Sequence, residues 1–287
     1  MNEIKIIGVI GAGQMGRGIA QVAASSDYQV VLFDAFEASL KKGFDFIKSQ
    51  LDKGAEKGKW SADFAKAALA RIKTVNSLTE FKDCDLIVEA ATENKVIKFD
   101  IFKKIDEVAK PSAILASNTS SISITEIAAT TKRPSKVVGM HFMNPVPVMK
   151  LIEGISGLET SDETFSAVAA VAKKMGKTFI KASDMPGFAV NRILMPYINE
   201  AVYTLHEGIA SVADIDEAMK LGTNVPMGPL TLADFIGLDT CLAIMNVLHE
   251  GLGDTKYRPC PLLRNYVNAG RLGKKSGRGF YDYSSQQ

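Results

Sequence analysis

Cysteine and long apolar runs are scarce in this 287-residue chain, and each scarcity excludes a class of protein. Its 3 cysteines are widely spaced and form no CxxC pair, so neither a disulfide framework nor a zinc site is expected. No apolar run approaches the roughly 18 residues of a membrane-spanning helix. The N-terminus also lacks the pattern of a signal peptide. We therefore expect a protein that begins near Met1 and works in the reducing cytoplasm.

Neither positive nor negative charge is in large excess. The chain has 34 lysines and arginines against 32 acidic residues, and the two signs alternate along it. Such a balance does not favour nucleic acid or an anionic membrane as the partner. A local concentration of lysines between Lys41 and Lys59 is the exception, and it makes a candidate site for a polyanion.

Short apolar runs alternate with longer helical patterns from residue 4 to about 180, which is typical of a mostly parallel sheet covered by helices. The expected strands are Ile4 to Ile10, Gln29 to Phe33, Asp85 to Ala90, Ala113 to Ser117, Lys136 to His141, Leu151 to Ile155 and Thr178 to Ile180. Residues 40–71 instead carry two helical patterns broken around Gly54 to Trp60, with Ser61 as a cap of the second. We expect this insertion to stand off the sheet as a helical hairpin.

The strand pattern stops after Pro186 and Gly187. Apolar residues then recur at helical spacing in Val190 to Glu207, Val212 to Leu221 and Leu230 to His249. The sequence therefore predicts an α/β fold in two domains. Residues 1–185 form a mostly parallel sheet with an inserted helical hairpin, and residues 186–287 form an all-helical C-terminal domain.

A glycine-rich turn follows the first expected strand. Gly11, Gly13 and Gly16 form a G-x-G-x-x-G run that includes Gln14 and Met15 and opens a helical pattern. Such a run supplies a tight turn, a backbone that a pyrophosphate can approach, and close packing of helix on strand. The run alone is a weak signal because glycine is common. Its place between a strand and a helix predicts a Rossmann-type, dinucleotide-binding domain.

Asp34 ends the second expected strand, about 20 residues after the glycine run. A carboxylate at that position accepts hydrogen bonds from the adenosine ribose hydroxyls and repels a 2′-phosphate. The sequence therefore favours NAD over NADP as the cofactor. A helix cap or turn residue is the alternative interpretation of Asp34.

His141 ends an apolar strand, whereas His206 and His249 fall within helical patterns and are interpreted as surface or packing residues. Ligands of open α/β sheets bind beyond the carboxyl ends of the strands, so His141 is well placed for acid–base chemistry. Glu153 follows in the next strand-like run. If the turn at Pro145 to Pro147 brings it beside His141, its carboxylate can hold one imidazole nitrogen and leave the other for substrate. A structural histidine and a solvent-facing glutamate are the alternatives.

Two polar clusters complete the candidate site. The run Asn118 to Ser121 follows the fourth expected strand, and Asn191 and Arg192 follow Asp184 to Phe188 at the domain junction. Serine and asparagine can donate hydrogen bonds to a developing oxyanion or orient a hydroxyl. A helix cap and a hinge sequence are the alternatives.

Taken in order, these residues resemble the 3-hydroxyacyl-CoA dehydrogenase family, and most closely its stand-alone bacterial 3-hydroxybutyryl-CoA dehydrogenases. The similarity covers nearly the whole chain, and it is carried by Gly11 to Gly16 with Asp34, Glu89 to Glu93 with Lys98, Ala116 to Ser121, Gly139 to Glu153, Asp184 to Arg192, and Asn224 to Leu230 with Asp234 to Asp239. The run Met140 to Lys150 and the D-x-x-G-F-x-x-N-R pattern at Asp184 to Arg192 are the most specific parts.

The resemblance implies a reaction and its catalytic residues. A short-chain L-3-hydroxyacyl-CoA, such as (S)-3-hydroxybutyryl-CoA, and its 3-oxoacyl-CoA, acetoacetyl-CoA, would be interconverted with NAD(H). His141 would be the general base paired with Glu153, while Ser120 and Asn191 would hydrogen-bond the reacting oxygen or position His141.

The resemblance also implies the binding residues. The cofactor contacts would be Gly11, Gly13, Gln14, Met15, Gly16, Asp34, Glu93, Lys98, Ser120 and Asn144. The acyl-CoA would meet Ser120, Asn191, and Lys53 and Lys57, which share one helix face because they lie four residues apart. A solvated lysine face is the alternative for the last two. The second domain would form a homodimer or a higher homo-oligomer.

Two other functions stay open on the sequence alone. A dehydrogenase of a free hydroxy acid or sugar acid has the same architecture, but such a small substrate needs no distant phosphate anchor like Lys53 and Lys57. A non-catalytic nucleotide-binding protein has no use for a proton-transfer pair such as His141 and Glu153.

Overall fold

The computed structural model describes residues 3–284. The chain divides into two compact units, Met1–Met185 and Pro186–Gln287. The first is built on a sheet and the second is helical, so the expected fold class is confirmed.

An eight-stranded sheet forms the centre of the first unit, in the order β3-β2-β1-β4-β5-β6-β7-β8. The strands are β1 (Ile6–Ile10), β2 (Gln29–Phe33), β3 (Ile72–Val75), β4 (Leu86–Glu89), β5 (Ile114–Ser117), β6 (Val137–Phe142), β7 (Leu151–Ser156) and β8 (Thr178–Ser183). All neighbouring strands pair in parallel except β6 and β7, which are antiparallel. The carboxyl ends of β1, β4, β5 and β6 therefore lie along one edge.

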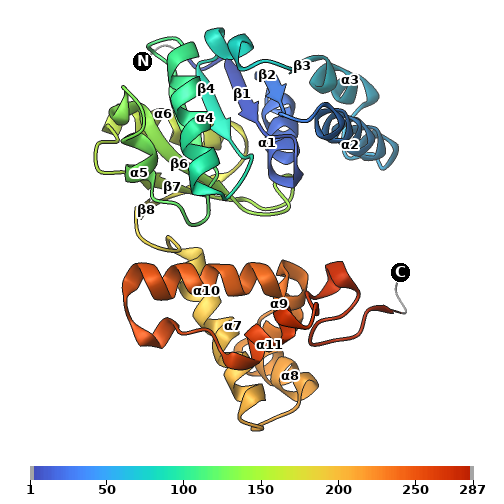
Figure 1. Cartoon of the computed structure of the whole chain (residues 1–287). Helices are drawn as coiled ribbons and strands as arrows, with labels where there is room; N and C mark the ends of the chain where they lie inside the picture. Colours follow the sequence, from blue (N-terminus) through green and yellow to red (C-terminus); the bar gives the residue numbers. More distant parts are fainter. Residues whose placement is uncertain (1–2, 285–287) are drawn as a thin grey trace. The chain divides into compact units, whose positions relative to one another are not determined.

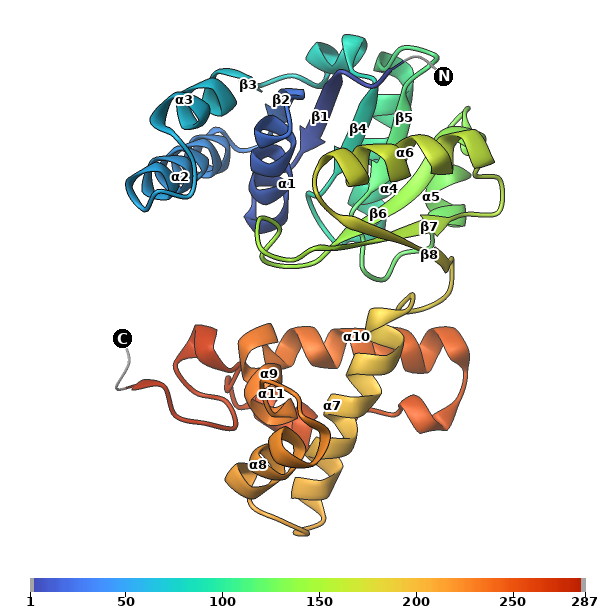
Figure 2. The ribbon, with the colours of Figure 1, turned by 180° about the vertical axis from the view of Figure 1, so that it is seen from behind.

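Helices cover both faces of this sheet. The helices α4 (Lys95–Val108) and α5 (Ile124–Ala128) lie on the face shown in Figure 1, and α1 (Gln14–Ser25) and α6 (Asp162–Lys174) lie on the face shown in Figure 2. Strand residues such as Val9, Val88 and Val138 are consequently fully buried. This double cover explains why the central strands are continuous apolar runs that can be recognised in the sequence.

The expected helical hairpin is present as α2 (Glu37–Glu56) and α3 (Ala62–Ala70). Ser61 caps α3 by accepting a hydrogen bond from the Phe64 amide at 3.1 Å, as expected. The Trp60 indole donates to the Leu51 carbonyl at 2.9 Å, and a Cβ built on Gly54 would lie 2.0 Å from the indole ring. Gly54 and Trp60 thus allow the two helices to close on each other, and the hairpin packs on α1.

One strand of the sheet was not expected from the sequence. The edge strand β3 has four residues, of which only Ile72 and Val75 are buried, and it pairs with β2 alone. A strand this short with two exposed positions lacks the apolar run by which the buried strands are recognised.

The second unit contains α7 (Val190–His206), α8 (Val212–Thr223), α9 (Pro229–Ile236), α10 (Leu238–Leu252) and α11 (Pro261–Asn268). The expected helix from Leu230 to His249 is therefore two helices, bent by 97°, because the chain turns at Gly237 with a φ of 103°. Among the described residues no single helix is long and apolar enough to cross a membrane, and α9 with α10 meets that criterion only as a bent pair.

Two buried carboxylates hold the last segment of the chain onto this helical unit. Asp234 accepts from the amides of Phe280 and Tyr281 at 3.0 and 2.9 Å, and Asp216 accepts from the Tyr281 hydroxyl at 2.9 Å. A Cβ built on Gly279 would lie 1.9 Å from an Asp234 oxygen. The glycine-rich and aromatic C-terminal run is thus an irregular segment docked by side-chain acceptors.

Candidate active site

The three glycines after β1 differ in their backbone conformation and in the space around them. Gly11 has a φ of 100°, which favours glycine, and a Cβ there would lie 2.7 Å from the Ala90 carbonyl. A Cβ on Gly16 would lie 1.8 Å from the Gly11 carbonyl oxygen. Gly13 has an ordinary φ of −66°, and a Cβ there would meet nothing within 4 Å. The chain's own packing therefore explains Gly11 and Gly16 but not Gly13.

The space beside Gly13 lies at the start of α1. Gly13 is the N-cap of this helix, and no side chain among residues 3–284 caps the amides or places an acidic group in the first turn. Amide groups at a helix N-terminus, approached over a residue without a side chain, suit a bound anion. The first residues of α1, Gln14 and Met15, are exposed and partly buried, respectively. These residues fit the pyrophosphate of a dinucleotide.

Asp34 lies directly after β2 and is tied to the glycine-rich loop. One carboxylate oxygen accepts from the Ala12 amide at 2.8 Å, and the other accepts from the Phe36 amide at 3.0 Å. Asp34 therefore does act as a turn residue, as the alternative interpretation held. A carboxylate can accept more than two hydrogen bonds, so this role leaves acceptor capacity for ribose hydroxyls.

His141 and Glu153 face each other across the antiparallel pair of β6 and β7. The imidazole Nδ1 lies 2.7 Å from Glu153 Oε2. His141 is 8% exposed and Glu153 is fully buried, so the charged end of the glutamate is removed from water. The pair lies next to the carboxyl end of β6, which stops at Phe142.

The loop after β5, residues 118–122, carries Ser120 and is called the Ser120 loop below; it is joined to the same end of β6. Asn118 Oδ1 accepts a hydrogen bond from the Phe142 amide at 2.9 Å. Through this oxygen Asn118 fixes the loop beside the strand of His141. This contact brings the loop that carries Ser120 to the end of the strand that carries His141.

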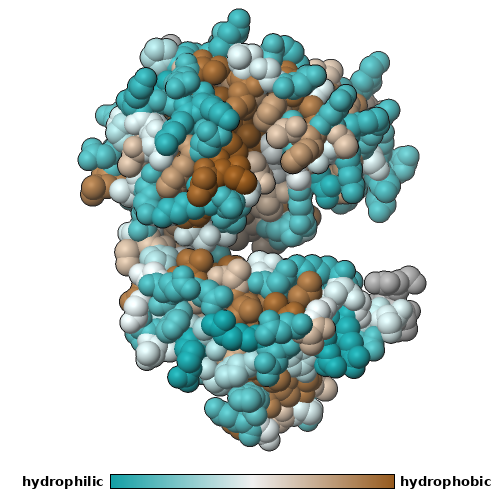
Figure 3. Space-filling view, in the orientation of Figure 1, coloured by the Kyte–Doolittle hydropathy of each residue, from teal (hydrophilic) through white to brown (hydrophobic). Residues whose placement is uncertain are grey.

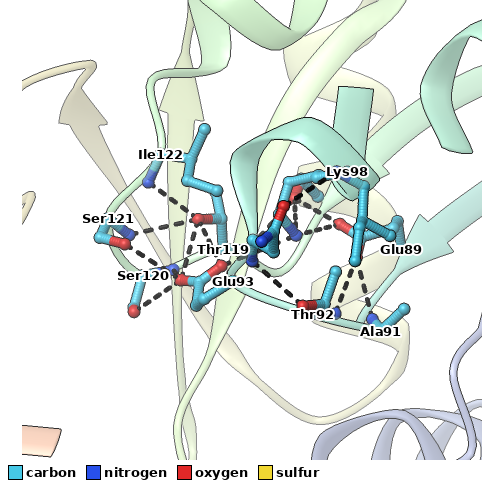
Figure 4. Close-up of polar contacts among 12 residues, drawn as sticks. Glu89, Ala91, Thr92, Glu93, Lys98, Thr119, Ser120, Ser121 and Ile122 are labelled. Carbon is cyan, nitrogen blue, oxygen red and sulfur yellow. Dashed lines mark hydrogen bonds and ion pairs between the residues drawn. The ribbon is translucent and has the colours of Figure 1, made fainter. Parts of the chain in front are cut away.

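Glu93 holds the Ser120 loop from the side of α4 (Figure 4). It accepts from the Ser120 amide at 2.6 Å and the Ser120 hydroxyl at 2.8 Å. It also accepts from the hydroxyls of Thr119 at 3.0 Å and Ser121 at 3.3 Å. The structure therefore brings together two predicted site residues, Glu93 and Ser120, that are far apart in the sequence.

Lys98 is almost fully buried on α4 and forms an ion pair with Glu89, the last residue of β4. Its ammonium also lies 3.7 Å from a Glu93 oxygen and 3.4 Å from the Ser117 hydroxyl. Sequence reasoning missed Glu89 as the partner of Lys98. The signal was present, because a carboxylate that closes an apolar strand must be paired.

The loop between β6 and β7 carries Asn144, which is exposed. The Lys177 ammonium holds this loop by donating to the carbonyls of Val146 at 2.5 Å and Met149 at 2.7 Å. Partial burial lowers the pKa of Lys177. No pattern in the sequence indicated this role, because lysine is an ordinary residue at the start of a strand.

The remaining predicted residues are carried by α2 and α7. Lys53 is in the last turn of α2 and Lys57 caps that helix, and neither forms an ion pair with any residue between 3 and 284. Asn191 is buried in the first turn of α7, in the second unit. Within the described part of the chain, no group of three or more potential ligands could hold a metal ion.

Two family models together match most of the chain. The NAD-binding domain of 3-hydroxyacyl-CoA dehydrogenase matches residues 6–185, and the C-terminal domain of 3-hydroxyacyl-CoA dehydrogenase matches residues 187–283. The chain belongs to the 3-hydroxyacyl-CoA dehydrogenase family. It is accordingly an enzyme of that family with NAD as its cofactor.

Relatives within the 3-hydroxyacyl-CoA dehydrogenase family match over almost their full length. A protein of Bacillus subtilis named "Probable 3-hydroxybutyryl-CoA dehydrogenase" is 58% identical over 99% of both chains. The 3-hydroxybutyryl-CoA dehydrogenase of Bradyrhizobium diazoefficiens is 55% identical over 98% of this chain and 96% of its own. The crystal structure of (S)-3-hydroxybutyryl-CoA dehydrogenase from Ralstonia eutropha matches with a TM-score of 0.96 and 52% identity, over 98% of this chain and 99% of that one.

Proposed function

We propose that this enzyme interconverts (S)-3-hydroxybutyryl-CoA and acetoacetyl-CoA with NAD(H), and that His141 and Glu153 handle the proton. The observation that carries the proposal is the 2.7 Å contact between His141 Nδ1 and a fully buried Glu153 carboxylate. The names of the relatives supply the substrate, since several of them are called 3-hydroxybutyryl-CoA dehydrogenases.

The contact with Glu153 decides how the imidazole can act. An ionised carboxylate only accepts hydrogen bonds, so Nδ1 carries the proton and Nε2 is the nitrogen that we propose accepts the proton of the alcohol. When Nε2 takes the alcohol proton, the buried carboxylate stabilises the imidazolium. In the reverse direction the imidazolium returns this proton to the forming alcohol. NAD, when bound, supplies the hydride chemistry at C3.

Ser120 and Asn191 are proposed to hydrogen-bond the reacting oxygen. The Ser120 hydroxyl donates to Glu93 in this structure, and it would turn from Glu93 to donate to the reacting oxygen, because the single proton of the alcohol goes to His141. Cofactor contacts are proposed for Gly11, Gly13, Gln14, Met15, Gly16, Asp34, Glu93, Lys98, Ser120 and Asn144. The Asp34 carboxylate at the glycine-rich loop would repel a 2′-phosphate, which favours NAD over NADP.

Lys53 and Lys57 are proposed to bind the phosphates of coenzyme A. They lie four residues apart at the end of α2, and neither ammonium is engaged by a carboxylate of residues 3–284. Acidic side chains are close by, because Lys53 lines a shallow groove with Asp45, Asp52 and Glu56. Lys53 is therefore set among acidic side chains, and the two lysines are not part of a broad positive field.

Oxidation of NADH with acetoacetyl-CoA tests the function, with free acetoacetate and NADPH as the alternative substrates. We expect turnover only with NADH and the thioester. His141→Ala and Glu153→Gln should lower kcat, with His141→Ala losing about 10²- to 10⁴-fold, while the Kd for NADH stays unchanged. Activity on the free acid, or an unchanged His141→Ala enzyme, would overturn the proposal.

The lysine anchor has its own test. Lys53→Ala and Lys57→Ala should raise the KM for acetoacetyl-CoA with little change in kcat, and added salt should shrink the difference from wild type. Lys66→Ala is the matched control, since Lys66 is an exposed lysine on the other helix of the hairpin. Equal effects of all three variants would leave Lys53 and Lys57 as ordinary surface charges.

A homodimer or higher homo-oligomer is proposed through the second unit. Large hydrophobic side chains are exposed there at Ile193, Ile209, Leu221 and Phe235, and Figure 3 shows hydrophobic surface on this unit. Exposed side chains of this size can be buried against a partner copy. Light scattering should give a multiple of the 31.0 kDa chain mass, and Ile193→Asp should lower it.

A further inference from the structure

The Ser120 loop is held at a second point, by Asp184. This residue follows β8 and lies in the first unit. Its carboxylate accepts from the Ser123 hydroxyl at 2.7 Å, from the Ile124 amide at 2.9 Å and from the Thr125 amide at 2.8 Å. All three donors belong to the start of α5, directly after the loop.

Two carboxylates therefore bracket Ser120. Glu93 binds donors of residues 119–121 on one side, and Asp184 binds donors of residues 123–125 on the other. Between them the Thr119 hydroxyl accepts from the amides of Ser121 and Ile122 at 3.2 and 2.9 Å. Amide and hydroxyl donors of residues 119–125 are thus hydrogen-bonded to acceptors of Glu93, Thr119 and Asp184.

The two acceptors come from different parts of the chain. Glu93 precedes α4, whereas Asp184 is the penultimate residue of the first unit and directly precedes Met185 and Pro186. The carboxylate of Asp184 consequently also fixes the end of β8 to the Ser120 loop. The same point of the chain leads into the second unit, where Asn191 follows seven positions after Asp184.

We propose that Asp184 is a positioning residue, which acts on the reaction by holding the loop in the conformation that presents Ser120. The proposal rests on the proposed function, because that function gives Ser120 its contact with the reacting oxygen. The contacts that define this role are those of the Asp184 carboxylate with residues 123–125, and no contact with substrate or cofactor is assigned to it. Its effect on turnover should therefore depend on the presence of the Ser120 hydroxyl.

The test is a double-mutant cycle of Asp184→Asn and Ser120→Ala. The asparagine replaces one acceptor oxygen by an amide group that cannot accept, so at least one of the three donors loses its partner. We expect Asp184→Asn to lower kcat/KM for acetoacetyl-CoA about tenfold. In the Ser120→Ala background the same change should cost less than about twofold. Asp162→Asn, an exposed aspartate of the same unit, is the control.

Three outcomes overturn the proposal. The first is wild-type kcat/KM in Asp184→Asn. The second is a full loss that persists in the Ser120→Ala background, which would mean that Asp184 acts elsewhere. The third is a fall in NADH affinity that persists in full in the Ser120→Ala background, which would indicate general loss of structure. If Asp184→Asn does not fold, Ser123→Ala removes one donor from the carboxylate, and its loss must likewise vanish in the Ser120→Ala background.

Amide hydrogen exchange separates this proposal from the proposed function. Asp184→Asn should accelerate exchange in the peptide of residues 118–125 and leave β1 and α1 unchanged, whether or not acetoacetyl-CoA is the substrate. An unchanged exchange rate in that peptide overturns the positioning role. Failure of the wild-type enzyme to turn over the thioester, with accelerated exchange in the variant, would refute the proposed substrate alone.

Discussion

Gly13 and Gly16 make a matched pair that separates a glycine required by a ligand from a glycine required by packing. A Cβ on Gly13 would meet nothing within 4 Å, and the φ of −66° suits any residue. A Cβ on Gly16 would lie 1.8 Å from the Gly11 carbonyl oxygen. Gly13→Ala should therefore damage the binding of NADH, and Gly16→Ala should damage the fold.

The expected magnitudes follow from these contacts. Alanine at position 13 gains about 0.4–1 kcal/mol from the unfolded chain, and it loses a similar amount because glycine is the better N-cap, by roughly 0.5–1 kcal/mol. The free energy of unfolding should then change by less than about 0.5 kcal/mol. A methyl group in the path of the pyrophosphate should cost about 1–3 kcal/mol, which weakens NADH binding roughly 5- to 150-fold.

Gly16→Ala should give the opposite result. The new methyl group meets a backbone oxygen that cannot rotate away, so the overpacking cost should reach about 3 kcal/mol. In a unit of this size that cost lowers Tm by roughly 6–12 °C. Calorimetry and titration of NADH fluorescence measure the two effects. Gly13→Ala with wild-type affinity for NADH would refute the assignment of this loop to the pyrophosphate.

Three further predictions concern buried groups. Burial raises the pKa of Cys84 and Cys241 to about 12, and it also raises the pKa of Cys260. The folded protein at pH 8 should therefore not react with a disulfide reagent, whereas all 3 thiols should react in denaturant. Burial and the hydrogen bond to Asp216 raise the pKa of Tyr281 to about 12, so this hydroxyl stabilises the second unit fully below about pH 10 and loses that effect as the pH rises towards 12. Tyr281→Phe should lower the free energy of unfolding by about 1–2 kcal/mol at pH 8 and by clearly less at pH 11, and an equal loss at both values would contradict the argument. Lys177→Met leaves the carbonyls of Val146 and Met149 without their donor, and urea denaturation should show a loss of about 1–3 kcal/mol, which Lys177→Arg partly restores.

The sequence predicted the buried strands well because parallel strands covered on both faces must be continuously apolar. Every expected strand is present, with ends that differ by at most three residues. The edge strand β3 was not predicted because its exposed Lys73 and Thr74 interrupt the run of apolar residues. Helical periodicity likewise continued through Gly237, since spacing reports which residues are apolar and not where the helix axis turns.

The candidate site was predictable as a set of residues and not as a set of contacts. The position of His141 at a strand end followed from the apolar pattern, but its contact with Glu153 depends on the antiparallel pairing of β6 and β7. The turn at Pro145 to Pro147 was the local pattern that suggested this pairing, but it did not fix which residues would lie opposite each other. The hydrogen bonds from Ser120 to Glu93 and from Thr125 to Asp184 join residues far apart in the sequence, and only the folded chain brings them together.

The antiparallel hairpin of β6 and β7 also restricts which insertions and deletions this enzyme can accept. Side chains alternate between the two faces of a strand, so a slip of one residue in β7 would place Ile152 or Gly154 opposite His141 and turn Glu153 to the other face. The connecting loop cannot readily accommodate a change in its length, because hydrogen bonds to Lys177 and to the Pro145 carbonyl fix its conformation. Chimeric enzymes that exchange this loop should therefore tolerate new residues in it far better than a changed number of them.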